Sequence, residues 1–398
     1  MKTIYLDHNA TTIMEQGALS SLLLYSSTAS SAELNFGNPS SIHWAGRRVK
    51  SVVDDAREDI AAAFGISSPD SLFFTGSATE ATNTAIKGAF FSALKNNKKF
   101  YLITTAVEHE ATLETANFCE ELGATVVRLG VDSQGALDLS ELAGALEQAP
   151  PGSDKLLSLM VANNETGVIF PWAEAARLAQ AQGALVHLDA VQAPGKIPGF
   201  SLAQAPVDFA SFSAHKIGGP KGVGALYARR GVKIESLLHG GAQERKRRAG
   251  TVNVAGIASF GAAAKTLSGR DLSAIARLRD HLEKEARRRI NGVSVQGERS
   301  PRIVNTSNLL FEGVRGEGLT MGLDLEGFAV SSGSACNSGS ILPSHVLLAM
   351  GIDKLGAQSA LRVSLGPANT LAEVDAFLES LEKVVARIRA SGQRAAVR

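Results

Sequence analysis

The chain has 398 residues, with 40 lysines and arginines against 39 aspartates and glutamates, and 44% of its residues are hydrophobic. This length is ample for a large buried core and predicts two packed lobes rather than one small module. The net charge of +1 argues against general binding to nucleic acid or to anionic membranes.

The N-terminus and the cysteine content predict a reducing compartment. The opening MKTIYLDHNATT reaches Asp7 and His8 before a signal-like apolar stretch develops. No segment approaches the ~18–20 consecutive apolar residues of a membrane helix. Two cysteines, Cys119 and Cys336, cannot build a disulfide framework or a four-cysteine zinc site. We therefore expect a cytoplasmic protein with no membrane partner.

Apolar runs alternate with helical patterns through the first two thirds of the chain. Gly65 is a plausible helix stop, and Ser77 to Glu80 fit a capping box that starts a helix after a strand at 72–75. Further strands are predicted at 100–104, 125–129, 156–161, 184–188, 207–212 and 223–227, with helices at 79–95, 108–122 and 171–182. Such alternation predicts an α/β fold with a mainly parallel sheet flanked by helices.

The composition changes near residue 265. A charged amphipathic helix within 265–292 is followed by weaker alternating segments. We expect a large domain over 16–264 and a smaller α+β domain formed by 1–15 and 265–398.

Polar side chains follow several of the predicted strands. Asp189 and Gln192 come after the run at 184–188, and Asn163, Asn164 and Glu165 follow 156–161. His109 follows 100–104, while Ser213, His215 and Lys216 follow 207–212. One such residue alone is more often a cap or a turn residue. Because ligands bind beyond the carboxyl ends of parallel strands, their repetition predicts one shared site.

Lys216 lies among glycines in SAHKIGGPKGVG, which permits two chemistries. A phosphate-binding loop of the Walker type requires Gly-Lys followed by Ser or Thr, and that pattern is absent. Alternatively, Lys216 forms a Schiff base with a cofactor, and Asp189 is the partner of a pyridinium nitrogen. A solvated loop lysine and a capping aspartate account for the residues equally well, so these residues alone leave the choice open.

Seven motifs in order carry a family resemblance. They are TGSATEATN (75–83), VEHEA (107–111), ANNETG (162–167), HLDAVQ (187–192), SFSAHKIGGPKGVGALY (211–227), RAGTVNVAG (248–256) and LRVSLG (361–366). Together they resemble the cysteine desulfurases, pyridoxal-phosphate enzymes of the aminotransferase class V group. The resemblance runs from about Tyr5 to Gly366 and implies a fold type I PLP-dependent transferase.

The motif around Cys336 resembles one subgroup of this family. VSSGSACNSG (330–339) followed by PSHVLLAMG (343–351) looks like the NifS/IscS-type subgroup, in which the cysteine receives sulfur as a persulfide. The serines and glycines around Cys336 are typical of an exposed loop, whereas Cys119 in a helical pattern is expected to be a buried apolar side chain.

The resemblance assigns roles around the cofactor ring. Lys216 would hold pyridoxal phosphate as a Schiff base and then remove the α-proton of L-cysteine. Asp189 would stabilise the protonated ring, Gln192 would donate to its phenolic oxygen, and His109 would stack on the ring and assist proton transfer. Asn164 would contact the ring or the substrate.

Further positions would bind the phosphate and the substrate. Ala78 and Thr79 open a helix whose N-terminus favours an anion, and Ser213 and His215 would add donors. By resemblance, Thr251 reaches the phosphate of the neighbouring subunit, which implies a homodimer. Arg362 would clamp the substrate carboxylate.

The implied activity is release of alanine from L-cysteine, with the sulfur passed from Cys336 to an acceptor or scaffold protein in iron–sulfur cluster assembly or thiolation. Apart from a transient iron–sulfur contact through Cys336, no metal site is expected. The alternatives are a selenocysteine lyase, a class V transaminase, or a scaffold protein that has lost catalysis. The sequence disfavours the last, because it keeps the full set of Lys216, Asp189, His109, Gln192 and Arg362.

Some features depart from the resemblance or compete with it. Gly76-Ser77 reverses the usual order, Ala249 replaces a serine, and Asn337 stands where small hydroxyl residues are common. The basic run at 245–248 is short and lacks aromatic neighbours, so we expect no nucleic-acid binding.

Overall fold

The computed structural model describes residues 3–26, 35–332 and 343–396, so Cys336 lies outside the described residues. The larger of its sheets has seven strands in the order β2-β8-β7-β6-β5-β3-β4. Their bounds are Leu72–Thr75 (β2), Phe100–Thr105 (β3), Thr125–Leu129 (β4), Asp154–Met160 (β5), Leu185–Asp189 (β6), Phe209–Ser213 (β7) and Gly224–Ala228 (β8).

This sheet is mainly parallel. The pairs that join β4, β3, β5, β6 and β7 are all parallel, whereas β8 runs antiparallel to both β7 and β2. The predicted α/β fold is confirmed, and each predicted strand overlaps an observed one.

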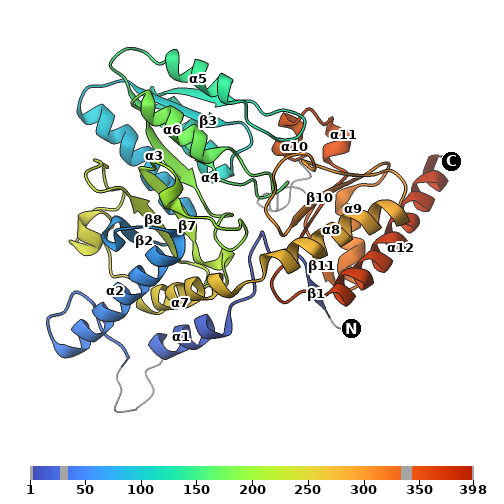
Figure 1. Cartoon of the computed structure of the whole chain (residues 1–398), viewed down its shortest axis with the longest axis horizontal. Helices are drawn as coiled ribbons and strands as arrows, with labels where there is room; N and C mark the ends of the chain where they lie inside the picture. Colours follow the sequence, from blue (N-terminus) through green and yellow to red (C-terminus); the bar gives the residue numbers. More distant parts are fainter. Residues whose placement is uncertain (1–2, 27–34, 333–342, 397–398) are drawn as a thin grey trace.

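Helices cover both faces of the sheet (Figure 1). Neighbouring strand residues enter different cores: Leu102 packs under α3 (Ala78–Lys95) and α4 (Glu110–Glu121), while Tyr101 and Ile103 face the opposite side. That alternation is the two-residue period of a strand. The opposite side is covered by α2 (Trp44–Phe64), α6 (Trp172–Ala181) and α7 (Val254–Lys265), with α1 (Gln16–Ser26) against α7 and α5 (Leu139–Glu147) against α6.

Two predicted helix ends have clear local causes. Gly65 ends α2 with φ +69°, a left-handed conformation that glycine adopts without steric cost. Ser77 caps α3 by accepting a hydrogen bond from the backbone N–H of Glu80. The second half of the predicted capping box differs, because Glu80 accepts from the N–H of Gly76 at 2.7 Å and pairs with Arg248 instead.

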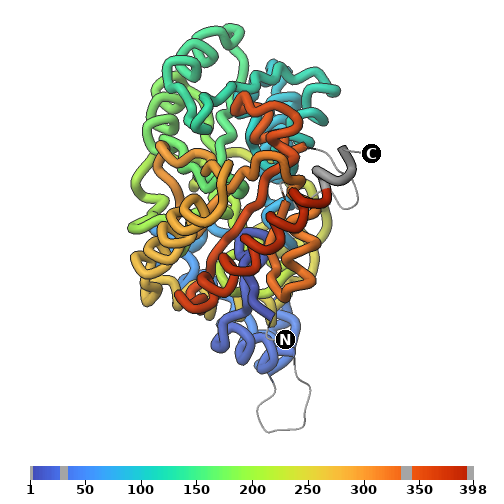
Figure 2. The backbone as a smooth tube through the Cα atoms, turned by 90° about the vertical axis from the view of Figure 1, so that its right-hand side faces the viewer, coloured from blue at the N-terminus to red at the C-terminus, as the bar shows by residue number. Residues whose placement is uncertain are grey.

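A second unit is built on smaller sheets. Strands β9 (Val293–Val295), β10 (Thr306–Phe311) and β12 (Ala360–Ser364) form an antiparallel sheet, and β1 (Ile4–Tyr5) pairs with β11 (Phe328–Ala329) in parallel. Its core lies under α8 (Leu272–Arg289), α9 (Gly316–Leu325) and α12 (Leu371–Ala396). Figure 2 shows α12 in red running along the outside of this unit.

The N-terminal segment joins the two units. Leu6 packs in the core of the second unit, whereas α1 packs on α7 of the first. Val346 and Leu347 of α10 (His345–Ala349), which is followed by α11 (Lys354–Ala357), pack in the core of the large sheet. The predicted domain boundaries stay a prediction. Among the described residues, no helix combines the length and apolar character that a membrane crossing requires.

Candidate active site

A cavity of about 310 Å³ lies where the parallel strands end. Its walls are side chains that directly follow those strands, together with the start of α3, the N-terminal segment and β12. Of the residues predicted for the site, it contains Ala78, Thr79, His109, Asn164, Asp189, Gln192, Ser213, His215, Lys216 and Arg362. The shared edge of a parallel sheet therefore brings together residues that are far apart in the sequence.

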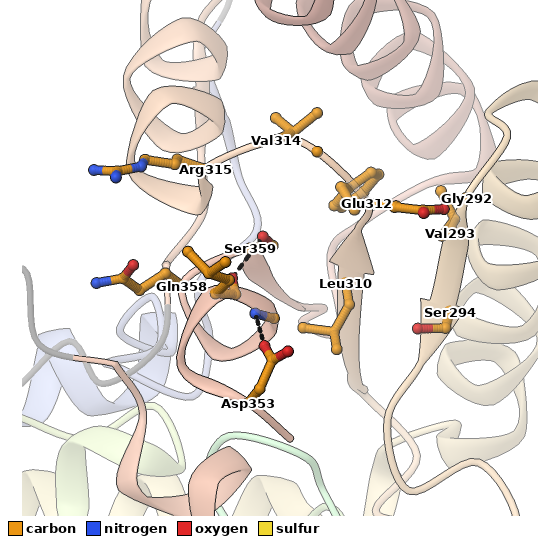
Figure 3. A pocket seen from close by; sticks show the side chains of 14 residues that line it. Gly292, Val293, Ser294, Leu310, Glu312, Val314, Arg315, Asp353, Gln358 and Ser359 are labelled. Atoms are coloured by element: carbon orange, nitrogen blue, oxygen red, sulfur yellow. Dashed lines mark hydrogen bonds between the residues drawn. The ribbon is translucent and has the colours of Figure 1, made fainter. Parts of the chain in front are cut away.

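A second pocket is larger, about 690 Å³, but it holds none of the predicted residues. It lies in the second unit, between β9, β10 and α11 (Figure 3). Asp353 at its rim caps α11 by accepting from the N–H of Gly356 at 2.7 Å. We assign the candidate site to the smaller cavity because the titratable and amide groups converge there.

The start of α3 forms one wall of the cavity. Gly224 on β8 crosses the turn so closely that a Cβ atom there would lie 2.4 Å from the carbonyl carbon of Ser77 and 2.8 Å from the nitrogen of Ala78. Glycine is required at Gly224 for this close backbone approach. The N-terminal N–H groups of the helix, at Ala78 and Thr79, therefore border the cavity and favour an anion.

Asp189 ends β6 and presents a buried carboxyl group to the cavity. Its Oδ1 accepts a hydrogen bond from the N–H of Val191 at 3.0 Å. Burial raises the pKa of Asp189, while His109, the Val191 N–H and Lys216 act to lower that pKa. A cation placed against this carboxylate would offset the cost of its desolvation.

Lys216 lies on the turn η3 (Ala214–Lys216) after β7. Its Nζ donates to the backbone carbonyls of Asn9 at 2.6 Å and Ala10 at 2.8 Å. His215 shares a hydrogen bond of 3.1 Å with Thr11 Oγ1. Burial, and then the charges of Lys216, Lys196 and Lys221, lower the pKa of His215 to about 4, so its imidazole is neutral at pH 7.

His109 is the N-cap of α4. Its Nδ1 accepts from the backbone N–H of Ala111 at 3.0 Å, which places the ring proton on Nε2. The preceding Glu108 is fully buried, and its Oε1 accepts from Thr105 Oγ1 at 2.9 Å and from the Met160 N–H at 3.0 Å. Burial raises the pKa of Glu108 to about 8, so its carboxyl is protonated at neutral pH.

Arg362 enters the cavity from β12. Its side chain is 2% exposed, and Nη2 donates to Asp7 Oδ1 at 2.7 Å while Nη1 donates to the carbonyl of Asn164 at 3.3 Å. Among the described residues, none forms a hydrogen bond with its buried Nε. The protein therefore holds the guanidinium at the cavity wall through Nη1 and Nη2.

The residues that follow β5 form a turn, and one of them also lines the cavity. Asn163 Oδ1 accepts from the backbone N–H groups of Glu165 and Thr166, so Asn163 shapes the loop. Glu165 is buried and accepts a hydrogen bond from Ser344. Only Asn164 of these predicted candidates lines the cavity.

One predicted site residue of the described part of the chain, Thr251, does not line this cavity. Thr251 lies on an exposed loop, and its predicted contact is with a second subunit, so that role stays a prediction. Cys336 falls outside the described residues. Cys119 is fully buried in α4, and burial raises the pKa of its thiol to about 11, which confirms its apolar role.

The sequence motifs missed three polar residues around the site. Asp7 pairs with Arg362, and Asn9 contacts Gln192 and Lys216 through its carbonyl oxygen. Lys196 is 5% exposed and donates to both Asn9 and Gln192. The available signal for Asp7 and Asn9 is the polar run DHNATT, which resembles the family in a segment at the site mouth or the subunit contact.

The sequence matches the aminotransferase class-V family model over residues 4–377. A cysteine desulfurase IscS from Dictyoglomus turgidum is 41% identical over 391 residues, which is 98% of this chain and 96% of that protein. The chain belongs to this cysteine desulfurase family. A solved NifS-like protein has a TM-score of 0.86 at 37% identity, covering 96% of this chain and 99% of its own. A structure of SspA in complex with cysteine has a TM-score of 0.79 at 29% identity, covering 92% and 100%.

The family uses pyridoxal phosphate, and the residues around the cavity fit that cofactor. Asp189 offers a carboxylate to a protonated ring nitrogen, and Lys216 offers an amine. The start of α3, with Ala78 and Thr79 on the cavity wall, offers backbone N–H groups to a phosphate. Gly224 packs directly against the backbone of Ser77 and Ala78, so a side chain there would displace this helix start.

Proposed function

We propose that this chain removes sulfur from L-cysteine, releasing L-alanine and leaving a persulfide on Cys336. The observation that carries the proposal is the meeting of Lys216, Asp189 and Arg362 in one cavity. An amine, a buried carboxylate and a guanidinium are the groups needed for a pyridine cofactor and an amino-acid substrate. The cysteine bound to SspA supports the choice of substrate.

When bound, pyridoxal phosphate supplies an electron sink that permits cleavage of the substrate's carbon–sulfur bond. Lys216 would hold the cofactor through Nζ, and the same amine would take the proton from the substrate α-carbon. The Asp189 carboxylate would keep a proton on a ring nitrogen. Gln192 would donate to an oxygen of the cofactor from Nε2, and His109 would cover the ring and assist proton transfer. Arg362 and Asn164 orient the substrate carboxylate.

Further groups bind the phosphate. The N–H groups of Ala78 and Thr79 and the side chain of Ser213 face the same cavity as Lys216. His215 donates one N–H as a neutral imidazole, since its pKa is about 4. These contacts place the anion at the positive end of the α3 dipole.

Cys336 accepts the sulfur atom. Its thiolate attacks the substrate sulfur, the carbon–sulfur bond breaks, and a sulfur–sulfur bond forms on the protein. The substrate carbon gains a proton, so one thiol and L-cysteine become one persulfide and L-alanine. A thiol-based acceptor or scaffold protein then takes the sulfur, as iron–sulfur assembly or thiolation requires, and a reducing compartment such as the cytoplasm suits this chemistry.

The active chain is proposed to be a homodimer in which Thr251 binds the phosphate in the partner's cavity. Exposed apolar side chains near the start of α2 support this proposal, because a second copy of the chain could bury them. Phe36 is 50% exposed, Ile42 90% and Trp44 54%. Such a patch is typical of an interface. Light scattering on the purified holoenzyme would give the mass of two chains, and a monomer would refute this arrangement.

The deciding experiment measures alanine release from L-cysteine with a reductant, for the wild type and for Cys336→Ser. Alanine from the wild type and almost none from the variant is expected. Equal alanine from both would indicate a lyase reaction that does not use Cys336, and testing selenocysteine would follow. No alanine from either, in a yellow protein, would indicate a class V transaminase. Absence of yellow colour would indicate a chain that has lost the cofactor and serves as a scaffold.

A further inference from the structure

Lys196 is a buried amine beside the cavity that the proposed reaction does not use. It lies seven residues after Asp189, and its side chain is 5% exposed. Nζ donates to Asn9 Oδ1 at 3.0 Å and also to Gln192 Oε1. Among the described residues, no carboxylate forms an ion pair with Lys196, and its hydrogen-bond partners are the amide oxygens of Asn9 and Gln192.

The surroundings of Lys196 disfavour a positive charge. Burial lowers its pKa, and the nearby charges of Lys216, Arg362 and Arg270 lower that pKa further, while Asp7 raises it. A neutral amine still has two N–H donors, which matches the two acceptors that Asn9 and Gln192 provide.

These contacts fix the orientation of the Gln192 amide. Lys196 Nζ donates to Gln192 Oε1, and the backbone carbonyl of Asn9, which can only accept, requires the amide nitrogen, so both contacts favour the same orientation. The nitrogen Nε2 is thereby turned the other way, where it donates to the backbone carbonyl of Asn9 at 3.1 Å beside the cavity. Without Lys196, only the Asn9 carbonyl would hold the amide, so its orientation would depend on one hydrogen bond instead of two.

Asn9 extends the same arrangement to the resting position of Lys216. Its side-chain nitrogen donates to the Asn164 carbonyl at 3.0 Å and to Thr306 Oγ1 at 2.7 Å, which sets its amide orientation. Its backbone carbonyl accepts from both Gln192 and Lys216. Asn9 is 1% exposed, so these bonds are shielded from water.

We propose that Lys196 is a positioning residue that holds the Gln192 amide with its nitrogen toward the cofactor cavity. Lys196 touches neither substrate nor cofactor, and acts through Gln192, with Asn9 as the third member of the group. The inference rests on the proposed role of Gln192 as a donor to bound pyridoxal phosphate. It predicts that removing Lys196 lowers the affinity for the cofactor, and by no more than removing the Gln192 amide does.

The test uses Lys196→Met, which keeps side-chain length and removes the donor, together with Gln192→Ala and the double variant. Affinity for pyridoxal phosphate is measured on the stripped protein, and the absorption maximum of the bound cofactor is recorded without substrate. We expect each single variant to bind roughly threefold to tenfold more weakly, the range for one hydrogen bond. Both should shift the absorption maximum in the same direction.

The double variant should bind about as weakly as Gln192→Ala alone, because the two residues act as one unit. Losses that multiply in the double variant would overturn the proposal, as would a Lys196→Met protein with wild-type affinity and spectrum. The control is Lys98→Met at a surface lysine that is 50% exposed and pairs with Asp154, which should leave both readouts unchanged. None of these readouts depends on alanine release, so a failed desulfurase assay is distinguishable from a failed inference.

If Lys196→Met does not fold, the contact is tested from the other side with Lys196 intact. Gln192→Glu and Gln192→Met are compared by thermal unfolding of the stripped protein. Lys196 would pair with the new carboxylate, so Gln192→Glu should unfold at the same or a higher temperature than Gln192→Met. A midpoint several degrees lower for Gln192→Glu would mean an unpaired buried carboxylate and would overturn the proposal.

Discussion

The ion pair between Asp7 and Arg362 offers the most direct test of how the N-terminal segment supports the active site. Asp7→Asn removes the negative charge and keeps the shape of the side chain. In the folded protein, Arg362 Nη2 lies 2.7 Å from Asp7 Oδ1, and the two side chains are 2% and 16% exposed. The variant would leave a guanidinium buried with only neutral acceptors.

The expected loss of folding free energy follows from that burial. A hydrogen bond to a charged group contributes about 1.5–3 kcal/mol, and breaking a fully buried pair costs about 3–5 kcal/mol. Because water reaches part of Asp7 and the asparagine retains an oxygen acceptor, we expect a loss of about 2 kcal/mol. The surface pair of Lys98 and Asp154 provides the comparison, since its side chains are 50% and 35% exposed.

The assay is urea unfolding of the stripped protein, followed by both near- and far-ultraviolet circular dichroism so that separate unfolding of the two units would be seen. Asp7→Asn should lower the midpoint with little change in slope. Asp154→Asn should cost less than about 1 kcal/mol, as exposed pairs do. A loss for Asp7→Asn no larger than that for Asp154→Asn would refute the argument that burial makes this pair important.

Three further changes test the cavity wall and its buried groups. Gly224→Ala should weaken pyridoxal phosphate binding at least tenfold in a titration of the stripped protein, because the new Cβ would lie 2.4 Å from the carbonyl carbon of Ser77. The control Gly144→Ala has open space around the new Cβ and should leave the binding unchanged. Burial raises the pKa of Glu108 to about 8, so the folded state binds that proton more tightly than the unfolded state, and the free energy of unfolding should fall as pH rises from about 4.5 to 8. Glu108→Gln should flatten this fall when urea unfolding is measured across the pH range. An unchanged pH dependence in the variant would contradict a raised pKa at Glu108. Burial lowers the pKa of His187 to about 3, so stability should be lost as pH falls below about 6.5, and His187→Asn should show a shallower loss between pH 6.5 and 4 by thermal unfolding.

Local patterns were sufficient for the elements of the large sheet. Runs such as 100–104 and 125–129 are short, apolar and bounded by helical patterns, and the observed strands coincide with them. The end of α2 at Gly65 and the cap at Ser77 depend on neighbouring residues only, so the sequence predicted both. The second half of the capping box is the exception, because the Glu80 side chain accepts from the Gly76 N–H and pairs with Arg248. Arg248 comes from a distant loop, which local reasoning does not include.

The residues of the candidate site also fall into those that the sequence predicts and those that only the structure identifies. Asp189 and Lys216 stand at strand ends, so a rule about parallel sheets predicts that they meet, and the family motifs identify their chemistry. Asn163 satisfies the same rule but shapes a turn. The distinction depends on which way a side chain leaves the loop, and composition does not encode it.

The sequence by itself determined the α/β class, the strand and helix positions and the set of residues at the strand ends, because these follow from hydrophobic period and from local capping. Only the tertiary structure decided which of those residues share one cavity and what holds them. Asp7 meets Arg362 across 355 positions, and Asn9 meets Lys196 across 187. Neither contact leaves a periodic pattern in the chain. Each exists because folding brings the N-terminal segment between two cores, where buried polar groups must find partners among whatever residues the two units present.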